Sequence, residues 1–226
     1  MTAPEQRAPK QDRSRITRER LLGASIDLLA TQGWAATTVG AVAAAAGVSR
    51  GAAQHHFPTR EDLITAALGH MIEQRLEDVR NVGLDLPAPG PERTVAVVRL
   101  IVEHYTSDLF KAALHVWTAA ASDPALRDRV LPLENHMSRE VLGIAASALG
   151  RDLSDARVRR GLQTTLDLAR GLGLADVLSD DSARRDKIVR YWAGTLDVVL
   201  GEPGPADADG PETDGRLATG AAGPSF

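Results

Sequence analysis

Apolar residues recur along this chain every three to four positions, in long segments separated by polar stretches that contain Gly and Pro. This spacing places the apolar side chains on one face of an α-helix, whereas a strand would need alternation at every second position. The chain has few aromatic residues but many Leu, Ala and Val, which suits packed helices. The pattern predicts an all-α protein with about nine helices.

Capping residues and helix breakers set the expected boundaries of these helices. Ser14 is a candidate N-cap of the first helix, which Gly33 ends. A Thr59 to Asp62 capping box opens a long helix, and Ser154 is a candidate N-cap further along. The other helices are expected over residues 92–105, 108–121, 124–149 and 183–200. Pro132 lies inside the third of these ranges and is expected to kink it.

Near the N-terminus, two short helices are predicted on either side of a tight turn. Thr37 and Thr38 offer hydroxyls to the unpaired N–H groups of the first helix. Its apolar face comprises Val39, Val42, Ala43 and Ala46. Gly47 ends this helix, Ser49 can cap the second, and Pro58 stops it. This arrangement is typical of the DNA-binding helix-turn-helix, with two alanine-rich core helices around an ordinary glycine break as the alternative.

A resemblance to the TetR family of transcriptional regulators is carried by the stretch TTVGAVAAAAGVSRGAAQHHFPTREDL. The matching positions are Thr37, Thr38, Val42, Ala43, Ala46, Gly47, Val48, Ser49, Gly51, His56, Phe57, Thr59, Arg60 and Leu63. The resemblance is sharp over residues 16–68. It implies an N-terminal three-helix helix-turn-helix domain followed by a helical ligand-binding and dimerisation domain. The chain departs from the family at Ala53 and Gln54, where an apolar residue and then tyrosine are common.

Charge divides the chain into two unequal parts. Residues 1–60 hold eight Arg or Lys against four Asp or Glu, so they carry +4 and the rest of the chain carries −8. A basic N-terminal part fits contact with DNA phosphates, although a merely solvated basic helix has the same composition. We expect a disordered basic arm over 1–13, the DNA-binding domain over 14–60, the helical ligand-binding and dimerisation domain over 61–200 and a disordered acidic Gly/Pro tail over 201–226.

The resemblance and helical projection together predict contacts with double-stranded DNA, in the form of a palindromic operator. Base contacts are expected from Arg50, Ala52, Gln54 and His55. Gln54 can pair with adenine and Arg50 with guanine, while Ala53 and Phe57 turn inward. Phosphate contacts are expected from Thr37, Thr38, His56 and Arg60. The resemblance implies that the N-terminal arm can lie against the minor groove through Lys10, Arg13 and Arg15, with a merely disordered terminus as the alternative. Arg15, Arg18 and Arg20 are expected near the DNA backbone.

The central helices contain polar and aromatic residues that suit a small-molecule pocket, which would be mostly apolar with a few polar groups. The main candidates are His104, Phe110, Trp117 and Met137, with Tyr105, His115 and His136 nearby in the sequence. The family resemblance implies such a pocket, and each of these residues is equally suited to an ordinary core position. The identity of the effector cannot be read from the sequence.

The last two predicted helices are candidates for a homodimer interface. Their apolar faces comprise Leu162, Leu166, Ala169 and Gly173 in the first helix and Ile188, Trp192, Leu196 and Val199 in the second. Two such faces from each subunit would form a four-helix bundle across a two-fold axis, as the resemblance implies.

Several classes of protein are disfavoured by what the sequence lacks. It has no cysteine, so it forms no disulfide or thiolate metal site, and it has no apolar run long enough to span a membrane. His55 and His56 are neighbours in a helix and point about 100° apart, so we expect no metal site there. No catalytic or nucleotide-binding motif is present, and no cofactor is expected.

The sequence therefore predicts a cytoplasmic, ligand-responsive transcriptional regulator, in the form of a repressor that a small apolar molecule releases from its operator. One alternative is an activator or a constitutive DNA binder without a ligand. Another alternative, from a different class, is an enzyme or carrier built on a helical bundle.

Overall fold

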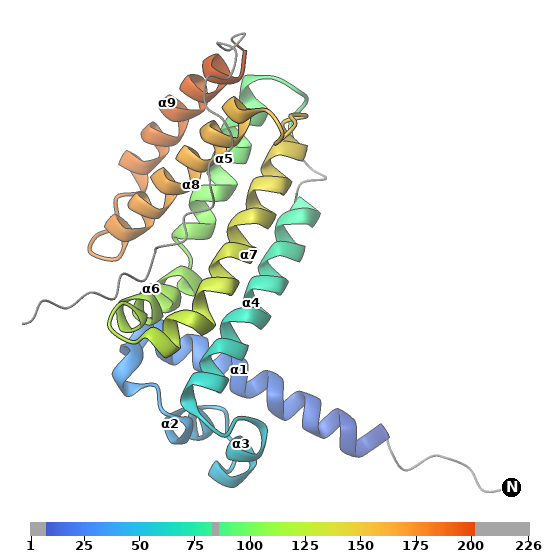
Figure 1. The fold of residues 1–226 in the computed structure, drawn as a ribbon, viewed down its shortest axis with the longest axis vertical. Helices are drawn as coiled ribbons and strands as arrows, with labels where there is room; N and C mark the ends of the chain where they lie inside the picture. Colours follow the sequence, from blue (N-terminus) through green and yellow to red (C-terminus); the bar gives the residue numbers. More distant parts are fainter. Residues whose placement is uncertain (1–7, 83–85, 202–226) are drawn as a thin grey trace, which may run out of the picture.

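The computed structural model describes residues 8–82 and 86–201, and within these ranges every regular element is a helix (Figure 1). In chain order the helices are α1 (Ala8–Ala36), α2 (Val39–Ala45), α3 (Arg50–His56), α4 (Arg60–Val82), α5 (Pro91–Tyr105), α6 (Asp108–Ala120), α7 (Pro124–Ala148), α8 (Ala156–Asp176) and α9 (Ser182–Gly201). The prediction of an all-α fold with about nine helices is confirmed for this part of the chain. None of the described helices is both long and apolar enough to cross a bilayer.

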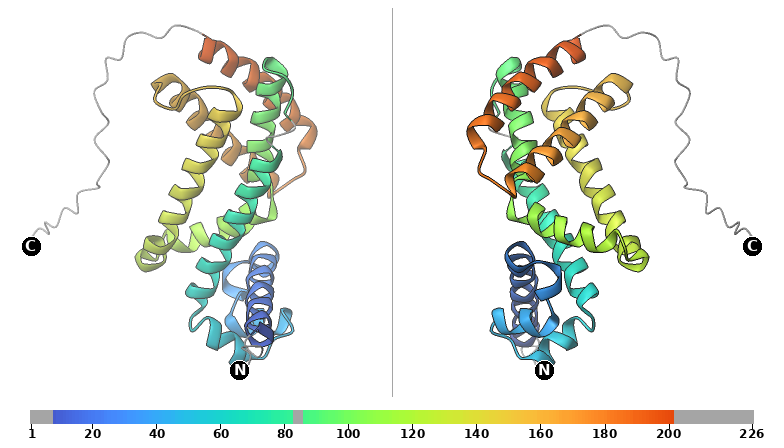
Figure 2. Two further views of the ribbon diagram at one scale, coloured as in Figure 1. Left: turned by 90° about the vertical axis from the view of Figure 1, so that its right-hand side faces the viewer. Right: turned by 90° about the vertical axis from the view of Figure 1, so that its left-hand side faces the viewer.

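The helices α1, α2 and α3 form a compact unit at one end of the molecule (Figures 1 and 2). Thr38 caps α2, because its hydroxyl accepts a hydrogen bond from the amide of Ala41 at 3.1 Å. Gly47 follows with φ at +65°, a left-handed conformation that glycine adopts without strain. The hydroxyl of Ser49 then accepts from the amide of Ala52 at 3.2 Å and starts α3. The local signals in the sequence therefore produce the predicted helix-turn-helix.

The beginning of α1 differs from the prediction. The helix starts at Ala8, six residues before the predicted cap, so Ser14 lies inside it. Residues 1–7 of the predicted arm and residues 202–226 of the predicted tail lie outside the described residues, as does the side chain of Lys10. At the other end of α1, Gly33 has φ 76° and ψ −177° and interrupts the helix at the predicted position.

The helix α4 connects the unit of α1, α2 and α3 to the rest of the molecule and packs against both α1 and α7. It begins with the predicted capping box, in which the amide of Asp62 donates to the hydroxyl of Thr59 at 3.1 Å. The hydrogen bonds from Thr59 and Arg129 lower the pKa of Asp62. Polar pairs then tie α4 to α7 along its length: Asp62 to Arg129 at 2.7 Å, Glu73 to His136 at 2.8 Å and Arg80 to Glu140 at 2.5 Å.

The helices α5, α8 and α9 form a hydrophobic core with parts of α4 and α7. It is separate from the core that α1, α2 and α3 share with the start of α4. The indole N–H of Trp192 in α9 donates to the hydroxyl of Thr165 in α8 at 2.9 Å. Asp155 caps α8, in place of the predicted Ser154, because its carboxylate accepts from the amide of Arg157 at 2.8 Å. Pro132 lies inside α7, and the helix continues on both sides of it.

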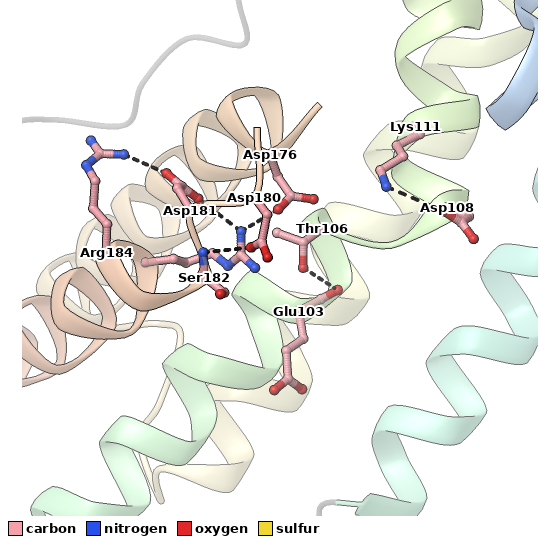
Figure 3. A network of polar contacts seen from close by, with 10 residues as sticks. Glu103, Thr106, Asp108, Lys111, Asp176, Asp180, Asp181, Ser182 and Arg184 are labelled. Atoms are coloured by element: carbon pink, nitrogen blue, oxygen red, sulfur yellow. Dashed lines mark hydrogen bonds and ion pairs between the residues drawn. The ribbon is translucent and has the colours of Figure 1, made fainter. Parts of the chain in front are cut away.

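An acidic cluster fixes the turn between α8 and α9 (Figure 3). Arg185 donates to Asp176 at 2.6 Å and to Asp181 at 3.1 Å, so the end of α8 is joined to the start of α9. The amide of Ser182 donates to Asp180 at 3.0 Å, which explains the lowered pKa of that carboxyl. The turn therefore has a defined conformation, although it carries the exposed apolar residue Leu178.

Candidate nucleic-acid interface

The helix α3 presents one polar face to the outside and one apolar face to the core. Arg50, Gln54 and His55 are exposed. Ala53 and Phe57 are buried against α1 and α2, as predicted. Ala52 is half-buried at the edge of the exposed face. The four predicted base-contact residues therefore lie at one end of the molecule, on the outer side of the helix-turn-helix (Figure 1).

Three of the four residues predicted to contact phosphates lie around this face. Thr38 is exposed at the start of α2, while His56 is half-buried at the end of α3. Arg60 is held by two contacts, since its guanidinium stacks 4.1 Å from the ring centroid of Trp34 and pairs with Glu61 at 3.2 Å. These contacts keep a cationic side chain beside the end of α3.

The prediction for Thr37 is wrong. Its side chain is fully buried, and its hydroxyl donates to the carbonyl of Gly33 at 2.8 Å. The hydroxyl thereby satisfies a backbone acceptor at the break in α1, so Thr37 has a structural role and cannot reach a phosphate. Of the two adjacent threonines, only Thr38 faces solvent.

The basic residues of α1 divide into paired and unpaired side chains. Arg15 pairs with Glu19 at 3.0 Å and lies 3.9 Å from Asp12. Arg13, Arg18 and Arg20 are exposed and have no acidic partner among the described residues. Arg18 also lies over the ring of Phe57 at 5.5 Å, which brings it beside the end of α3.

Most of the predicted dimer interface lies inside the protomer instead. Leu162, Leu166, Ala169 and Leu196 are completely buried in the core between α5, α8 and α9. Gly173 is also buried, because α8 crosses the end of α5 so closely that a Cβ there would lie 2.0 Å from the carbonyl oxygen of Tyr105. Five of the eight predicted residues are therefore unavailable to a partner. Ile188 and Trp192 are half-buried, and only Val199 is exposed.

A different face of α8 and α9 is exposed. We call it the outer face; its residues recur every three or four positions. They are Arg160, Thr164, Asp167, Gly171, Leu174 and Leu178 from α8 and the turn after it, and Lys187, Tyr191, Gly194 and Val198 from α9. Leu178 is 89% exposed and Tyr191 77% exposed, which is unusual for such large apolar groups.

The four predicted pocket residues do come together. His104, Phe110, Trp117 and Met137 line one small cavity of about 40 Å³ between α4, α5, α6 and α7. The rings of Tyr105, Phe110 and Trp117 meet edge to face beside it, with centroids 5.1 and 5.7 Å apart.

His115 and His136 do not take part in this cavity. His115 is exposed on α6 beside Gly33, and His136 pairs with Glu73.

His104 is the unusual member of the cavity. It is only 6% exposed, and its Nδ1 atom has no hydrogen-bond partner among the described residues. Burial, together with the positive charges of Arg75 and Arg170, lowers its pKa to about 4, so the imidazole is neutral at pH 7. Its spacing from Val97 and Ile101 places it on the buried face of α5, a signal present in the sequence. No such signal identified Arg75.

Potential metal ligands do not gather anywhere in the described residues.

Arg170 beside the cavity is paired with Glu134 at 2.6 Å and Asp167 at 2.9 Å, and its guanidinium lies over the ring of Tyr105 at 5.5 Å. Burial raises the pKa of Tyr105 to about 12, so its hydroxyl stays protonated.

Comparison with known proteins gives a consistent result. A family model described as "Bacterial regulatory proteins, tetR family" matches residues 21–67. The chain is similar to the HTH-type transcriptional regulator CymR of Pseudomonas putida, with 30% identity over 188 residues, covering 80% of this chain and 90% of that protein. It is also similar to the crystal structure of a TetR-family regulator from Rhodococcus sp., with 25% identity, a TM-score of 0.60 and coverage of 81% and 98% of the two chains. A TetR-family structure from Mesorhizobium loti, at 16% identity, shares the fold with a TM-score of 0.65 over 83% of this chain and 98% of that one.

Proposed function

The chain belongs to the TetR family of transcriptional regulators, and we propose that it binds a palindromic operator as a homodimer and leaves it when a small molecule binds. As a member of this family it is a DNA-binding regulator of transcription rather than an enzyme. The observation that carries the proposal is the exposed polar face of α3, with Arg50, Gln54 and His55 outside and Ala53 inside. The proposed place of action is the cytoplasm, where bacterial DNA lies.

The polar face of α3 is suited to direct readout of DNA bases. The major groove accepts one α-helix, whose side chains then meet the base edges. Gln54 can both donate to and accept from adenine, and Arg50 can donate two hydrogen bonds to guanine. Neither side chain has a hydrogen-bond partner among the described residues, so both are available to DNA.

Contacts to the DNA backbone would hold α3 in register. Thr38, His56 and Arg60 are the proposed phosphate contacts, and Arg18 joins them because it lies beside the end of α3. These groups add affinity for any sequence and no base preference. The net charge of +4 over residues 1–60 favours the approach of this end of the molecule to DNA.

A homodimer through the outer face of α8 and α9 would bring two copies of α3 to one side of a duplex. Leu174, Leu178, Tyr191 and Val198 supply apolar surface that solvent otherwise covers. Gly171 and Gly194 lie among them, and glycines permit two helices to approach closely. Because a two-fold interface pairs each patch with its own copy, every apolar contact on this face is made twice.

The helix α6 offers a route from the cavity to the DNA-binding unit. One side of α6 lines the cavity with Phe110 and Trp117. Its other side packs into the core of α1 to α4 through Ala112, Val116 and Ala120. A ligand that needs more room than about 40 Å³ would move α6 and with it α1. Release then requires only that the ligand prefers the arrangement in which two copies of α3 cannot both reach DNA.

In vitro selection of duplexes from a random pool, followed by footprinting, tests this proposal. We expect a palindrome whose half-site centres lie about one helical turn apart, protected as one discrete region. Enrichment of no sequence, or a protected region that spreads without limit, would contradict sequence-specific binding. Transcription from a promoter that contains the selected site distinguishes a repressor, for which the added protein lowers transcript levels, from an activator.

A further inference from the structure

Two buried polar atoms without partners lie between α4 and α5. The Nε atom of Arg75 in α4 is buried and makes no hydrogen bond among the described residues, and the guanidinium has no ion pair there. The Nδ1 atom of His104 in α5 is also buried and makes no hydrogen bond among the described residues. A buried polar group without a partner is destabilising, so two of them together indicate that something else satisfies them.

The chemistry of the two groups defines the missing partner. A guanidinium can only donate hydrogen bonds, and a neutral imidazole donates from one of its two ring nitrogens. Arg75 lies close enough to His104 for its charge to lower the pKa of the imidazole. Arg170 is the other arginine whose charge lowers the pKa of His104, and it already forms ion pairs with Glu134 and Asp167. The unmatched charge is therefore that of Arg75, and its natural complement is an anion with oxygen acceptors.

The two groups have different surroundings: Arg75 lines a groove at the surface, whereas His104 lines an apolar cavity. Arg75 lines a surface groove of about 550 Å³, together with Met71, Ser107 and Leu109. Leu109 also lines the cavity to which His104 contributes. The groove beside Arg75 and the apolar cavity therefore adjoin at Leu109.

His104 lines two apolar cavities. One is the cavity of about 40 Å³, with Ile72, Phe110 and Met137. The other is a cavity of about 30 Å³ whose lining side chains, apart from His104, are entirely hydrocarbon, including Ile101 and Val141. Each cavity is far smaller than the several hundred Å³ of a typical ligand pocket, so a ligand would have to join and widen them.

We propose that the effector of this protein is an apolar organic acid, with a single carboxylate held by Arg75 and His104 and a hydrocarbon body in the joined cavities. This inference rests on the proposed function, since it names the ligand class of the proposed regulatory site. Glu77 and Asp78 line the same groove and repel further negative charge, which favours a monocarboxylate over a polyanion. The carboxylate would connect α4, which begins beside the DNA-binding unit, to α5.

Binding of matched acids and amides to the full-length protein tests the proposal. The probes are the straight-chain alkanoates of six to twelve carbons, an arylalkanoate (3-phenylpropanoate) and the primary amide of each acid, measured by calorimetry at pH 7. We expect at least one acid to bind about 10- to 100-fold more tightly than its amide, as a charge-assisted contact predicts. If no acid in the series binds more tightly than its amide, the proposal is overturned.

Variants of α4 and α5 complete the test. Arg75→Gln should remove the preference for the acid over the amide, and His104→Gln should reduce it. The control Arg80→Gln, on the same helix but exposed and paired with Glu140, should keep it. Retention of the full preference in Arg75→Gln would contradict the assignment, and so would its loss in Arg80→Gln. Because the proteins are assayed separately for DNA binding without any probe, failure of the ligand class is distinguished from failure of DNA binding.

Discussion

The guanidinium of Arg60, the first residue of α4, lies 4.1 Å from the centroid of the indole ring of Trp34, which follows the break at Gly33 near the end of α1. Such a cation–π contact contributes about 0.5 to 2 kcal/mol, depending on how far the groups are removed from water. It fixes the start of α4 to the DNA-binding unit. It also holds a positive charge beside α3, where a phosphate of bound DNA would lie in our account.

Replacing Arg60 with Ala should therefore weaken binding to all duplexes alike. The slope of log K against log salt concentration should become shallower by about one unit for each half-site, because one phosphate contact is lost per subunit. The measurement is fluorescence anisotropy over a series of salt concentrations. The control is Arg80→Ala, at the far end of the same helix, which should leave the slope unchanged. An unchanged slope in Arg60→Ala would remove this residue from the phosphate contacts.

Replacing Tyr191 with Asp should dissociate the proposed dimer. The substitution places a carboxylate in the outer face and removes an apolar contact from each subunit. A loss of about 1.5 kcal/mol per copy raises the monomer–dimer dissociation constant about 100-fold or more.

Sedimentation velocity over a range of concentrations measures this change. Leu131→Asp is the matched control, because Leu131 is also a large exposed apolar residue but lies on α7, outside the outer face. If both variants stay dimeric, or if the wild-type protein is a monomer, the assigned interface is wrong.

The close crossing of α8 and α5 predicts a pair of glycine variants with opposite effects. In Gly173→Ala the new methyl group would lie 2.0 Å from a backbone oxygen and 2.7 Å from the ring of Phe110, so α8 and α5 must move apart. We expect a loss of about 3 kcal/mol or more in the free energy of unfolding.

Two positions earlier, Gly171 is exposed on the same helix, with no atom within 4 Å of its Cβ position. In the Tyr191→Asp background, in which the proposed dimer contact is absent, Gly171→Ala should raise the helix propensity of α8 and stabilise the protomer by about 0.5 to 1 kcal/mol. Urea unfolding at one protein concentration compares the two variants. Equal stability of Gly173→Ala and the wild type would show that the helices do not cross this closely.

Burial of His104 predicts that stability falls in mildly acidic solution. The pKa of His104 is about 4 in the folded protein against 6.5 for the free side chain. Between these values the unfolded chain binds the proton and the folded protein does not, so stability rises with pH through this window. From pH 7 to pH 5 the expected loss is roughly 2 kcal/mol from this group.

Urea unfolding at pH 7, 6 and 5 measures this loss. His104→Gln should remove most of the dependence, since no group titrates at that position. The lowered pKa of Asp62 affects stability only at lower pH, because its contribution is lost below the ordinary value of 3.8. If the wild type and His104→Gln lose equal stability between pH 7 and 5, then His104 is not buried as described.

The fold of the N-terminal unit followed from the sequence because its signals are local. Gly47, Ser49 and Pro58 act on the backbone within two or three residues, so their effects do not depend on the rest of the molecule. Capping residues in the sequence do not identify the actual N-cap where two adjacent residues could both serve. Thr38 rather than Thr37 caps α2, because the hydroxyl of Thr37 is buried and bonded to Gly33. Asp155 rather than the exposed Ser154 caps α8, because its carboxylate accepts from the amide of Arg157.

The surfaces between helices could not be predicted in the same way. Leu162 and Leu166 form the most apolar face of α8, and a core within the protomer and an interface between protomers both favour such a face. The outer face mixes Leu174 and Tyr191 with charged residues, so periodicity alone does not reveal it. The lack of an ion-pair partner for Arg75 among the described residues depends on which side chains the fold brings near it, among them Ser107 and Leu109, and no local pattern in the sequence shows this.

Readout of DNA bases by α3 in two half-sites is the central claim, and one titration tests it most directly. The full-length protein is titrated at fixed salt against its selected operator and against the same duplex with one half-site scrambled, in wild-type form and as Gln54→Ala. We predict that the wild type binds the intact operator at least 100-fold more tightly, and that Gln54→Ala loses about 1 to 3 kcal/mol of this discrimination per half-site with little change in affinity for unrelated DNA. Equal affinity of the wild type for the two duplexes, or a Gln54→Ala variant that discriminates as the wild type does, would contradict the account.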